Sequence, residues 1–451
     1  MRRLFGTDGV RGIANEYLSC ERAVQIGRAL GTVLSSNHKY RPKVLIGMDT
    51  RISSEMLCSA LCAGLCSVGA DCVTLGVVPT PAVAYLVQKY NAKAGVMISA
   101  SHNPYPYNGI KIFGAEGYKL SDELEEQIES IVLDNTPPPK PASAEKIGVR
   151  RDAPDAINDY IEYLKTTTDA RFDGMRIAID CANGSSSVTA RKLFSSMGAE
   201  CHMLSMSPDG VNINEKCGST HLEALKEYVK TNDCVAGIAF DGDADRCLAV
   251  DENGNEVDGD FIMAILALHL KSQGKLKRDT VVGTIMTNYG FPKFCEANRL
   301  RFVATNVGDR YVLETINREG YCFGGEQSGH IILREFATTG DGQLTALALL
   351  SCLKESGKKL SELCEVMKRY PQHTENISAT PEGKIAMFTD EEIKAIVKEA
   401  EAKLAGNGRI VVRPSGTEPV VRIMIESEDL DETIALCKDT ASRIAEKLAN
   451  Y

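Results

Sequence analysis

Short apolar runs, rich in β-branched residues and closed by Gly, Asp, Asn or Ser, recur along the chain. Runs of this kind are typical of strands buried on both faces of a sheet. They predict strands over residues 43–49, 95–99, 175–180, 235–241, 281–286, 302–305 and 409–413. The amphipathic stretches between them predict helices over residues 55–67, 120–133, 221–230 and 261–271. Strands that alternate with helices indicate parallel sheets with crossover helices, so we expect an α/β fold.

The chain has 451 residues, which is too long for a single hydrophobic core. The strands that end at Asp49, Asp180 and Met286 each begin a similar β-α-β segment, which indicates three related α/β units. Stretches rich in proline or in turn residues mark the expected boundaries, at 136–141, 251–256 and 370–373. We therefore expect four domains, at residues 1–150, 151–254, 255–369 and 370–451.

Charge and composition exclude several classes of protein. The net charge is −10 and no run of Lys or Arg occurs, so a nucleic-acid partner is not expected. No apolar run is long enough to cross a membrane, and residues 1–6 lack the apolar stretch of a signal peptide. The 15 cysteines form no C-x-x-C metal knuckle. We therefore expect reduced thiols and a cytoplasmic protein.

The sequence Asp241-Gly-Asp-Ala-Asp245 follows directly after a predicted strand. Its alternating carboxylates can all turn onto one hard cation, because the loop is short and flexible. Three carboxylates so close together repel one another, so a neutralising partner is expected. This loop predicts a metal site whose ligands are Asp241, Asp243 and Asp245.

A second loop, Ser99-Ala-Ser-His-Asn-Pro104, follows another predicted strand, and Lys111 lies shortly after it. The Asn-Pro pair favours a turn that presents Ser101. We expect His102 and Lys111 to supply cationic donors beside this hydroxyl. A serine near a divalent cation can accept and return a phosphoryl group, because the cation offsets charge on the transferred oxygens. Ser101 is therefore the candidate nucleophile.

A third loop, at residues 413–419, is followed by Arg422 in a predicted strand. Arg413 and Arg422 offer planar guanidinium forks, and the Ser, Gly and Thr of the loop offer hydroxyl and backbone N–H donors. This combination suits a phosphate. Because the loop lies far along the chain from Ser101, it indicates a substrate that is held by one end while the other end reacts.

Two further loops are rich in glycine. Residues 324–330 place polar side chains between glycines, which suits sugar hydroxyls, and His330 can act there as a general acid or base. The opening stretch 6–12 permits close approach of the backbone to a ligand, and Arg11 can meet a phosphate there.

These five loops, in this order along the chain, resemble those of the α-D-phosphohexomutase superfamily. The matching stretches are residues 6–12, 99–104, 241–246, 325–330 and 413–419. Five motifs in one order are much more specific than any one of them. The resemblance implies three related α/β domains, with mixed or parallel sheets, and a smaller α+β C-terminal domain around a central cleft.

The resemblance also implies a role for each matching residue. Ser101 would carry a phosphoryl group, and Mg²⁺ would be held by that phosphate and the three aspartates. Lys111 and His330 match positions that shuttle protons, and Arg11 and His102 complete the catalytic set. The residues matched to substrate contacts are Arg246, Glu326, Ser328, Arg413, Ser415, Gly416, Thr417 and Arg422.

Within the superfamily, residues 325–330 and 422–426 are similar to the bacterial branch that interconverts glucosamine 6-phosphate and glucosamine 1-phosphate. The implied intermediate and activator is glucosamine 1,6-bisphosphate. Tyr107 departs from this branch, which commonly has Asp there, and is more typical of relatives that act on mannose or glucose phosphates. That second branch is the alternative. The implied partners are the phosphosugar and a donor that first phosphorylates Ser101, and a homodimer is an expectation from the family alone.

Two other classes of protein share parts of this pattern. A phosphatase of the haloacid-dehalogenase type has alternating aspartates near the start of a domain, whereas this triplet lies mid-chain beside a separate serine loop. A phosphosugar-binding sensor needs the phosphate loop but neither Ser101 nor the aspartates. A covalently phosphorylated Ser101 distinguishes a mutase from both.

Overall fold

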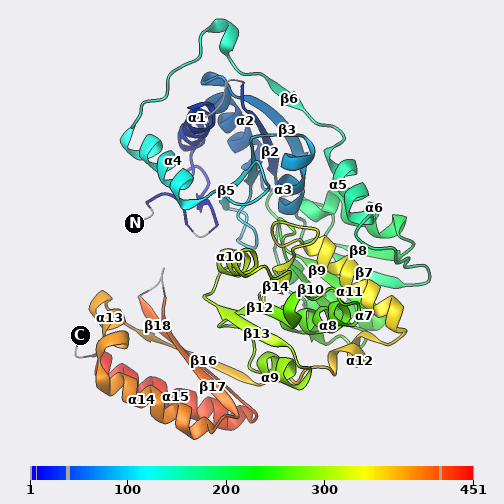
Figure 1. The fold of residues 1–451 in the computed structure, drawn as a ribbon, viewed down its shortest axis with the longest axis vertical. Helices are drawn as coiled ribbons and strands as arrows, with labels where there is room; N and C mark the ends of the chain where they lie inside the picture. The colour runs from blue at the N-terminus through cyan, green and yellow to red at the C-terminus, as the bar shows by residue number, and fades with distance from the viewer. Residues whose placement is uncertain (1–2, 7, 37–40, 416–418, 450) are drawn as a thin grey trace. The chain divides into compact units, whose positions relative to one another are not determined.

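The structure is a computed structural model that describes residues 3–6, 8–36, 41–415, 419–449 and 451. Two predicted site residues, Gly416 and Thr417, lie outside the described residues. The chain divides into two compact units (Figure 1). The first unit comprises Met1–Thr284 and Thr305–Glu365, and the second comprises Ile285–Ala304 and Val366–Tyr451.

The first sheet has six strands in the order β1-β5-β4-β2-β3-β6. Four of them run parallel, namely β2 (Lys43–Met48), β3 (Asp71–Val77), β4 (Ala94–Ile98) and β6 (Arg150–Asp152). Two run antiparallel to their neighbours, namely β1 (Val10–Ile13) and β5 (Tyr107–Gly114). Three helices share a hydrophobic core with one face of this sheet: α1 (Cys20–Ser36), α2 (Ser54–Ser67) and α4 (Asp122–Asp134). On the other face, a Cβ on Gly47 or Gly95 would collide with Val83 of α3 (Thr80–Lys89), so α3 packs closely there.

The second sheet has five strands in the order β11-β10-β9-β7-β8. Its parallel strands are β7 (Arg176–Asp180), β8 (Glu200–Leu204) and β9 (Ala236–Phe240). Its antiparallel strands are β10 (Cys247–Asp251) and β11 (Glu256–Val257), joined by the predicted turn at 251–256. The helices of this region are α5 (Ala156–Lys165), α6 (Ala190–Ser196) and α7 (Glu223–Thr231).

A third sheet of the first unit contains β12 (Thr280–Thr284), β14 (Phe323–Gly325) and β15 (Ile331–Leu333). Strands β12 and β14 are parallel, and β15 is antiparallel to β14. The helices of this region are α8 (Gly259–Ser272), α10 (Asp309–Glu319), α11 (Gly342–Ser356) and α12 (Leu360–Cys364).

The first two sheets repeat one topology. The order β5-β4-β2-β3 matches β10-β9-β7-β8, with three parallel strands and one antiparallel strand beside the third in each case. Strands β12, β14 and β15 match the first, third and fourth strands of this pattern. The prediction of three related α/β units is therefore confirmed.

The second unit is smaller and differs in kind. Its antiparallel sheet has the order β16-β18-β17, with β16 (Gln372–Ser378), β17 (Gly408–Pro414) and β18 (Val420–Ser427). The helices packed in this unit include α13 (Pro381–Thr389), α14 (Glu391–Leu404) and α15 (Leu430–Leu448), which share one hydrophobic core with the sheet. The unit also contains α9 (Gly290–Ala297) and all of β13 (Arg301–Thr305) except its last residue, which belongs to the first unit. Within the described residues, no helix combines the length and apolarity that a membrane span requires.

Candidate active site

Three polar loops occupy the same place in the three related α/β units, directly after the third parallel strand and before the antiparallel one. The loop with Ser101 joins β4 to β5, the loop with the aspartates joins β9 to β10, and residues 326–330 join β14 to β15. Ligands of α/β sheets bind beyond the carboxyl ends of parallel strands, so all three loops lie at ligand-binding edges. Side-chain contacts between the loops bring them to one site.

The three aspartates predicted as metal ligands meet in a buried cluster. Asp241, Asp243 and Asp245 each offer one carboxylate oxygen, and these oxygens all lie within 4.8 Å of one another. The hydroxyl of Ser101 donates a hydrogen bond of 2.5 Å to Asp241 Oδ2, which joins the serine loop to the cluster. Gly242 permits this approach, because a Cβ there would lie 2.6 Å from the Ser101 carbonyl oxygen.

This cluster fits a divalent cation. Asp243 Oδ1 and Asp245 Oδ1 are buried and have no hydrogen-bond partner among the described residues. Burial, followed by the charges of Asp245 and Asp243, raises the pKa of Asp241 well above its usual value. Carboxylate oxygens are the ligands that a hard cation such as Mg²⁺ prefers, and buried oxygens without a hydrogen-bond partner are available to bind it.

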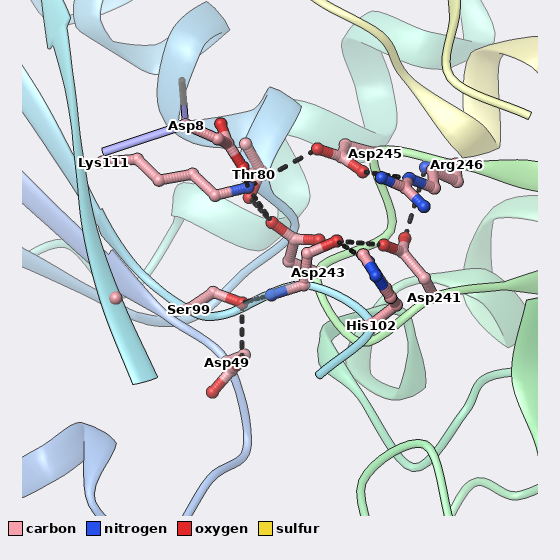
Figure 2. A network of polar contacts seen from close by, with 12 residues as sticks. Asp8, Asp49, Thr80, Ser99, His102, Lys111, Asp241, Asp243, Asp245 and Arg246 are labelled. Atoms are coloured by element: carbon pink, nitrogen blue, oxygen red, sulfur yellow. Dashed lines mark hydrogen bonds and ion pairs between the residues drawn. The ribbon is translucent and has the colours of Figure 1, made fainter. Parts of the chain in front are cut away.

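Lys111, on β5, is the main basic partner of the cluster, and its side chain is 1% exposed. Its Nζ lies 2.8 Å from Asp243 Oδ2, 2.9 Å from Asp8 Oδ2 and 3.6 Å from Asp245 Oδ2 (Figure 2). Burial alone would lower the pKa of Lys111, but Asp243 and Asp8 outweigh burial and raise it, so Lys111 is charged. Thr80, the first residue of α3, completes the surroundings of Asp243: its N–H donates to the Asp243 carbonyl at 2.9 Å and its hydroxyl to Oδ2 at 2.5 Å.

His330 lies next to the aspartate cluster and contacts it through Asp245. Its Nδ1 lies 3.6 Å from Asp245 Oδ2, and its Nε2 lies 3.6 Å from Asp309 Oδ2. The backbone N–H of Gly340 donates to Nε2 at 3.0 Å. Burial would lower the pKa of His330, but Asp245 and Asp309 raise it to about 9. The two predicted proton carriers, Lys111 and His330, are therefore both placed beside Asp245.

His102 lies beside Ser101, but its expected charge is wrong. His102 Nδ1 lies 3.5 Å from Ser101 Oγ. Burial, together with Arg246 and Arg11, lowers the pKa of His102 to about 4, so this imidazole is neutral rather than cationic. The Nε atoms of Arg11 and Arg246 are buried without a hydrogen-bond partner among the described residues. Two such donors suit the oxygens of a phosphate.

The predicted sugar loop forms a tight turn next to the metal loop. The N–H of Glu326 donates to the His330 carbonyl at 3.0 Å, and its Oε1 accepts from the N–H of Gly308 at 3.1 Å. The N–H of Cys247, two residues after Asp245, donates to the Gly329 carbonyl at 3.0 Å. Ser328 lies in this turn and is partly exposed. The loop is thus joined directly to the strand that follows the aspartates.

The predicted phosphate loop belongs to the second unit. Arg413 on β17 and Arg422 on β18 are opposite partners in the antiparallel register. Burial and the neighbouring charge of Arg422 lower the pKa of Arg413. Ser415 follows β17, and the ammonium of Lys384 donates to its carbonyl oxygen at 2.6 Å. The structure therefore places Arg413 and Arg422, the two predicted phosphate-binding arginines, opposite each other near the end of β17.

Sequence reasoning missed several polar residues of the site. Lys119 Nζ bridges Asp8 Oδ1, at 2.5 Å, and Asp309 Oδ2, at 2.6 Å, and so connects the opening loop to α10. Arg51 and Asn214 both donate hydrogen bonds to the Ser101 carbonyl. Asp8 could have been found, because it stands between glycines in a loop already singled out, whereas no pattern distinguishes the others.

Profiles of known families match nearly the whole chain. All four describe parts of phosphoglucomutase/phosphomannomutase: alpha/beta/alpha domain I at residues 2–138, domain II at 158–254, domain III at 258–370 and the C-terminal domain at 376–443. Curated proteins of high similarity bear a more specific name. The phosphoglucosamine mutase of Clostridium botulinum is 50% identical over 450 residues, covering 99% of this chain and 100% of that protein. That of Acetivibrio thermocellus is 53% identical over 431 residues, covering 96% of each.

A solved structure with the same fold is a phosphoglucomutase/phosphomannomutase family protein from Burkholderia thailandensis, with a TM-score of 0.82. The match covers 100% of this chain and 98% of the other, at 20% sequence identity, and therefore bears on the fold alone. Profiles along the chain and full-length relatives at about half identity agree. The chain belongs to the phosphoglucomutase/phosphomannomutase family, within the α-D-phosphohexomutase superfamily.

Proposed function

We propose that the chain is an intramolecular phosphotransferase that interconverts glucosamine 6-phosphate and glucosamine 1-phosphate, and so supplies UDP-N-acetylglucosamine synthesis. One observation carries the chemistry: the Ser101 hydroxyl donates a hydrogen bond to Asp241, one of three clustered aspartates. The other two, Asp243 and Asp245, each keep a buried oxygen without a hydrogen-bond partner among the described residues. The hexosamine substrate is supported by full-length relatives, 50% and 53% identical, that are named phosphoglucosamine mutase.

In this proposal Mg²⁺ would be held by Asp241, Asp243, Asp245 and the phosphate on Ser101. When bound, the ion supplies positive charge that neutralises the oxygens of the transferred phosphoryl group. The protein adds its own cations around the same place, because Lys111 contacts two of the aspartates and Arg246 follows them directly. This concentration of positive charge favours the dianionic substrate.

The reaction has two mirror-image halves. The bond between phosphorus and Ser101 Oγ breaks while phosphorus bonds to the free hydroxyl oxygen at C1 or C6. Lys111 or His330, which carries a proton, gives it to the departing Ser101 Oγ and takes the proton of the attacking hydroxyl. The glucosamine 1,6-bisphosphate turns round without leaving. Ser101 Oγ then takes the phosphoryl group from the other end. The proton carrier gives its proton to the departing sugar oxygen and regains one from the Ser101 hydroxyl.

The remaining predicted residues hold the substrate in this scheme. Glu326 and Ser328 bind sugar hydroxyls, and Arg11 and His102 lie at the reacting phosphate. The phosphate that does not react is bound by Arg413, Ser415, Gly416, Thr417 and Arg422. A clamp that accepts either phosphate is needed because the intermediate binds in two orientations.

We also propose four domains with boundaries near residues 150, 254 and 369, supported by the extents of the four matched profiles. A cytoplasmic location is supported by 15 cysteines that are all free. Ser101 needs a donor for its first phosphoryl group, and the 1,6-bisphosphate is able to serve. Sedimentation analysis tests the expected homodimer.

The first experiment compares glucosamine 6-phosphate, mannose 6-phosphate and glucose 6-phosphate as substrates, with Mg²⁺ and a trace of the matching 1,6-bisphosphate. We expect a strong preference for the glucosamine compound, and intact-mass analysis should find one phosphoryl group on the wild type. The variant Ser101→Ala should keep its circular dichroism and lose both turnover and the phosphoryl group. Full activity in this variant would contradict the assignment of Ser101. A preference for mannose or glucose phosphate would move the protein to the neighbouring branch.

A further inference from the structure

Arg51 lies entirely within the protein, beneath the loop that carries Ser101. It stands between β2 and α2, and its Nε lies 2.8 Å from Asp49 Oδ2, with both side chains 0% exposed. A buried arginine remains charged and costs free energy unless every donor is used. The partners of its remaining donors therefore reveal what the residue is for.

Those partners are carbonyl oxygens of a single loop. Nη2 donates to the carbonyls of Ser101 and Asn103, each at 2.8 Å. Nη1 donates to the carbonyls of Pro104, at 2.6 Å, and Tyr107, at 2.9 Å. With Nε on Asp49, all three guanidinium nitrogens are engaged, and the backbone between Ser101 and Tyr107 is wrapped around one planar group.

Asp49 holds the other side of the Ser101 backbone through a relay. The hydroxyl of Ser99 donates to Asp49 Oδ2 at 2.6 Å, and the N–H of Ser101 donates to that hydroxyl at 2.9 Å (Figure 2). Asp49 Oδ1 accepts from the hydroxyl of Ser54 at 2.9 Å, which ties the carboxylate to the start of α2. The N–H and the carbonyl of Ser101 are thus both fixed by the Arg51–Asp49 pair.

Ser101 needs this support because its backbone is strained. Its φ is 52°, in the left-handed region that L-residues other than Asn and Asp rarely adopt. A residue persists in such a conformation only where its surroundings over-determine it. Asn214, from the second sheet region, adds hydrogen bonds to the carbonyls of Ser101 (2.9 Å) and Asn103 (3.2 Å).

We propose that Arg51 is a positioning residue for phosphoryl transfer, which holds Ser101 in its left-handed conformation so that Oγ faces the aspartate cluster. The proposal rests on the proposed function. Arg51 acts through the backbone of the loop and meets no substrate. Its effect is on geometry, and a displacement of about 1 Å at a reacting group can cost about 100-fold in rate. Lysine cannot replace it, because an ammonium offers its donors from one point and lacks the planar fork.

The test uses Arg51→Lys in the full chain. This variant keeps a positive charge beside Asp49, so the fold should hold. We expect kcat to fall about 100-fold while KM for glucosamine 6-phosphate stays within about threefold, because the substrate contacts are untouched. Hydrogen exchange of residues 100–107 should become faster.

Two control variants make this result specific. Arg409→Lys removes an equivalent fork in the second unit, where Arg409 pairs with Glu426 and donates to the Ile285 and Thr287 carbonyls. It should leave exchange at residues 100–107 unchanged. Arg176→Lys changes a partly exposed arginine of β7 and should leave kcat unchanged.

The outcomes separate this proposal from the proposed function. If the wild type turns over none of the sugar phosphates and carries no phosphoryl group, the proposed function is contradicted. Hydrogen exchange in Arg51→Lys still tests whether Arg51 holds the backbone of residues 101–107. An active wild type with unchanged kcat and exchange in Arg51→Lys overturns the positioning role. So does a variant that only melts earlier. If Arg51→Lys fails to fold, Asn214→Ala takes its place, because it removes only the Asn214 hydrogen bonds to the Ser101 and Asn103 carbonyls. We expect this variant to lose about tenfold in kcat. Unchanged kcat together with unchanged hydrogen exchange would overturn the proposal.

Discussion

The aspartate cluster (Asp241, Asp243 and Asp245) and the arginine pair (Arg413 and Arg422) each bring like charges together, but the repulsion between these charges is reduced in different ways. Asp241, Asp243 and Asp245 are buried in the first unit, and two of them, Asp243 and Asp245, share an internal cation, Lys111. The guanidiniums of Arg413 and Arg422 in the second unit lie at partly exposed positions of β17 and β18, where the high dielectric constant of the solvent weakens their repulsion. A buried set must be neutralised for the chain to fold, whereas an exposed pair can form first and bind its ligand later. Under the proposed function, a metal would therefore stay with the protein while phosphate is bound and released in each turnover.

The comparison is tested most strongly by Asp241→Asn. This variant replaces a proposed anionic metal ligand with a neutral amide, although the amide oxygen can still accept from the Ser101 hydroxyl, so kcat should fall by about 1,000-fold or more. Without metal, however, it should melt above the wild type, because burial and the neighbouring aspartates disfavour ionisation of Asp241 in the folded state, whereas an amide does not ionise. Activity assays and thermal melts with Mg²⁺ or a chelator measure both effects, and Asp173→Asn, at an exposed position, is the control. A lower melting temperature than the wild type in chelator would contradict the comparison.

The arginine pair should respond in KM rather than in kcat. Arg422→Gln removes one charged fork from a phosphate, so KM for glucosamine 6-phosphate should rise by about 10- to 100-fold. Phosphorylation of Ser101 by the 1,6-bisphosphate at saturation should stay intact, as intact-mass analysis would report. If kcat fell by the same factor while KM stayed constant, this region would not be a clamp.

A carboxylate outside the cluster, Asp341, shows the effect of burial where hydrogen bonds only partly offset it. Asp341 caps α11 by accepting from the Leu344 N–H at 3.0 Å, and it accepts from the Tyr160 hydroxyl at 2.8 Å. Burial raises the pKa of Asp341 to about 6. The unfolded carboxyl ionises at lower pH, so the folded state binds the proton more tightly and loses stability as pH rises from about 4 to 6.

Asp341→Asn should remove this loss while keeping the cap, because its amide oxygen can still accept from Leu344. Relative to the wild type, the variant should gain about 2 kcal/mol in unfolding free energy between pH 4.5 and pH 7.5. Melting curves at both pH values measure the difference. Equal differences at the two pH values would show that Asp341 is ionised without cost in the folded state.

The smallest expected effect concerns free phosphate. Inorganic phosphate at about ten times its Kd should stabilise the second unit by about 1.4 kcal/mol. Hydrogen exchange resolved by unit should detect this gain in the wild type and lose it in Arg422→Gln. Equal protection of both units would place the main phosphate site elsewhere and weaken the contrast between the two regions.

Much of the fold was readable from the alternation of apolar runs and amphipathic stretches. Strands β2, β4, β7 and β9 and helices α2 and α7 lie within a few residues of their predicted places. The antiparallel strand that follows each third parallel strand was not predicted, because the direction of a strand depends on its neighbours in the sheet. The common position of the three site loops follows from that topology and is equally invisible in the sequence.

The candidate site was predictable where chemistry concentrates in a short stretch of chain. The aspartate triplet and Ser101 were found in this way, and they meet as expected. His102 was given the wrong charge because the sequence does not show its burial beside Arg246. Arg51 was missed for a different reason: its partners are backbone carbonyls, which every residue possesses.

The bonds from Thr80 to Asp243 have a thermodynamic consequence. Asp243 belongs to the second sheet region, whereas Thr80 and Lys111, which fix its carboxylate, belong to the first. A metal ion that binds best when Asp243 has this position also stabilises the association of the two sheet regions. By thermodynamic linkage, association of the two regions raises the affinity for the ion by the same factor as the ion raises their association constant. Ion affinity therefore measures how firmly the two regions are docked, and substitutions at their junction should release the ion before either region unfolds.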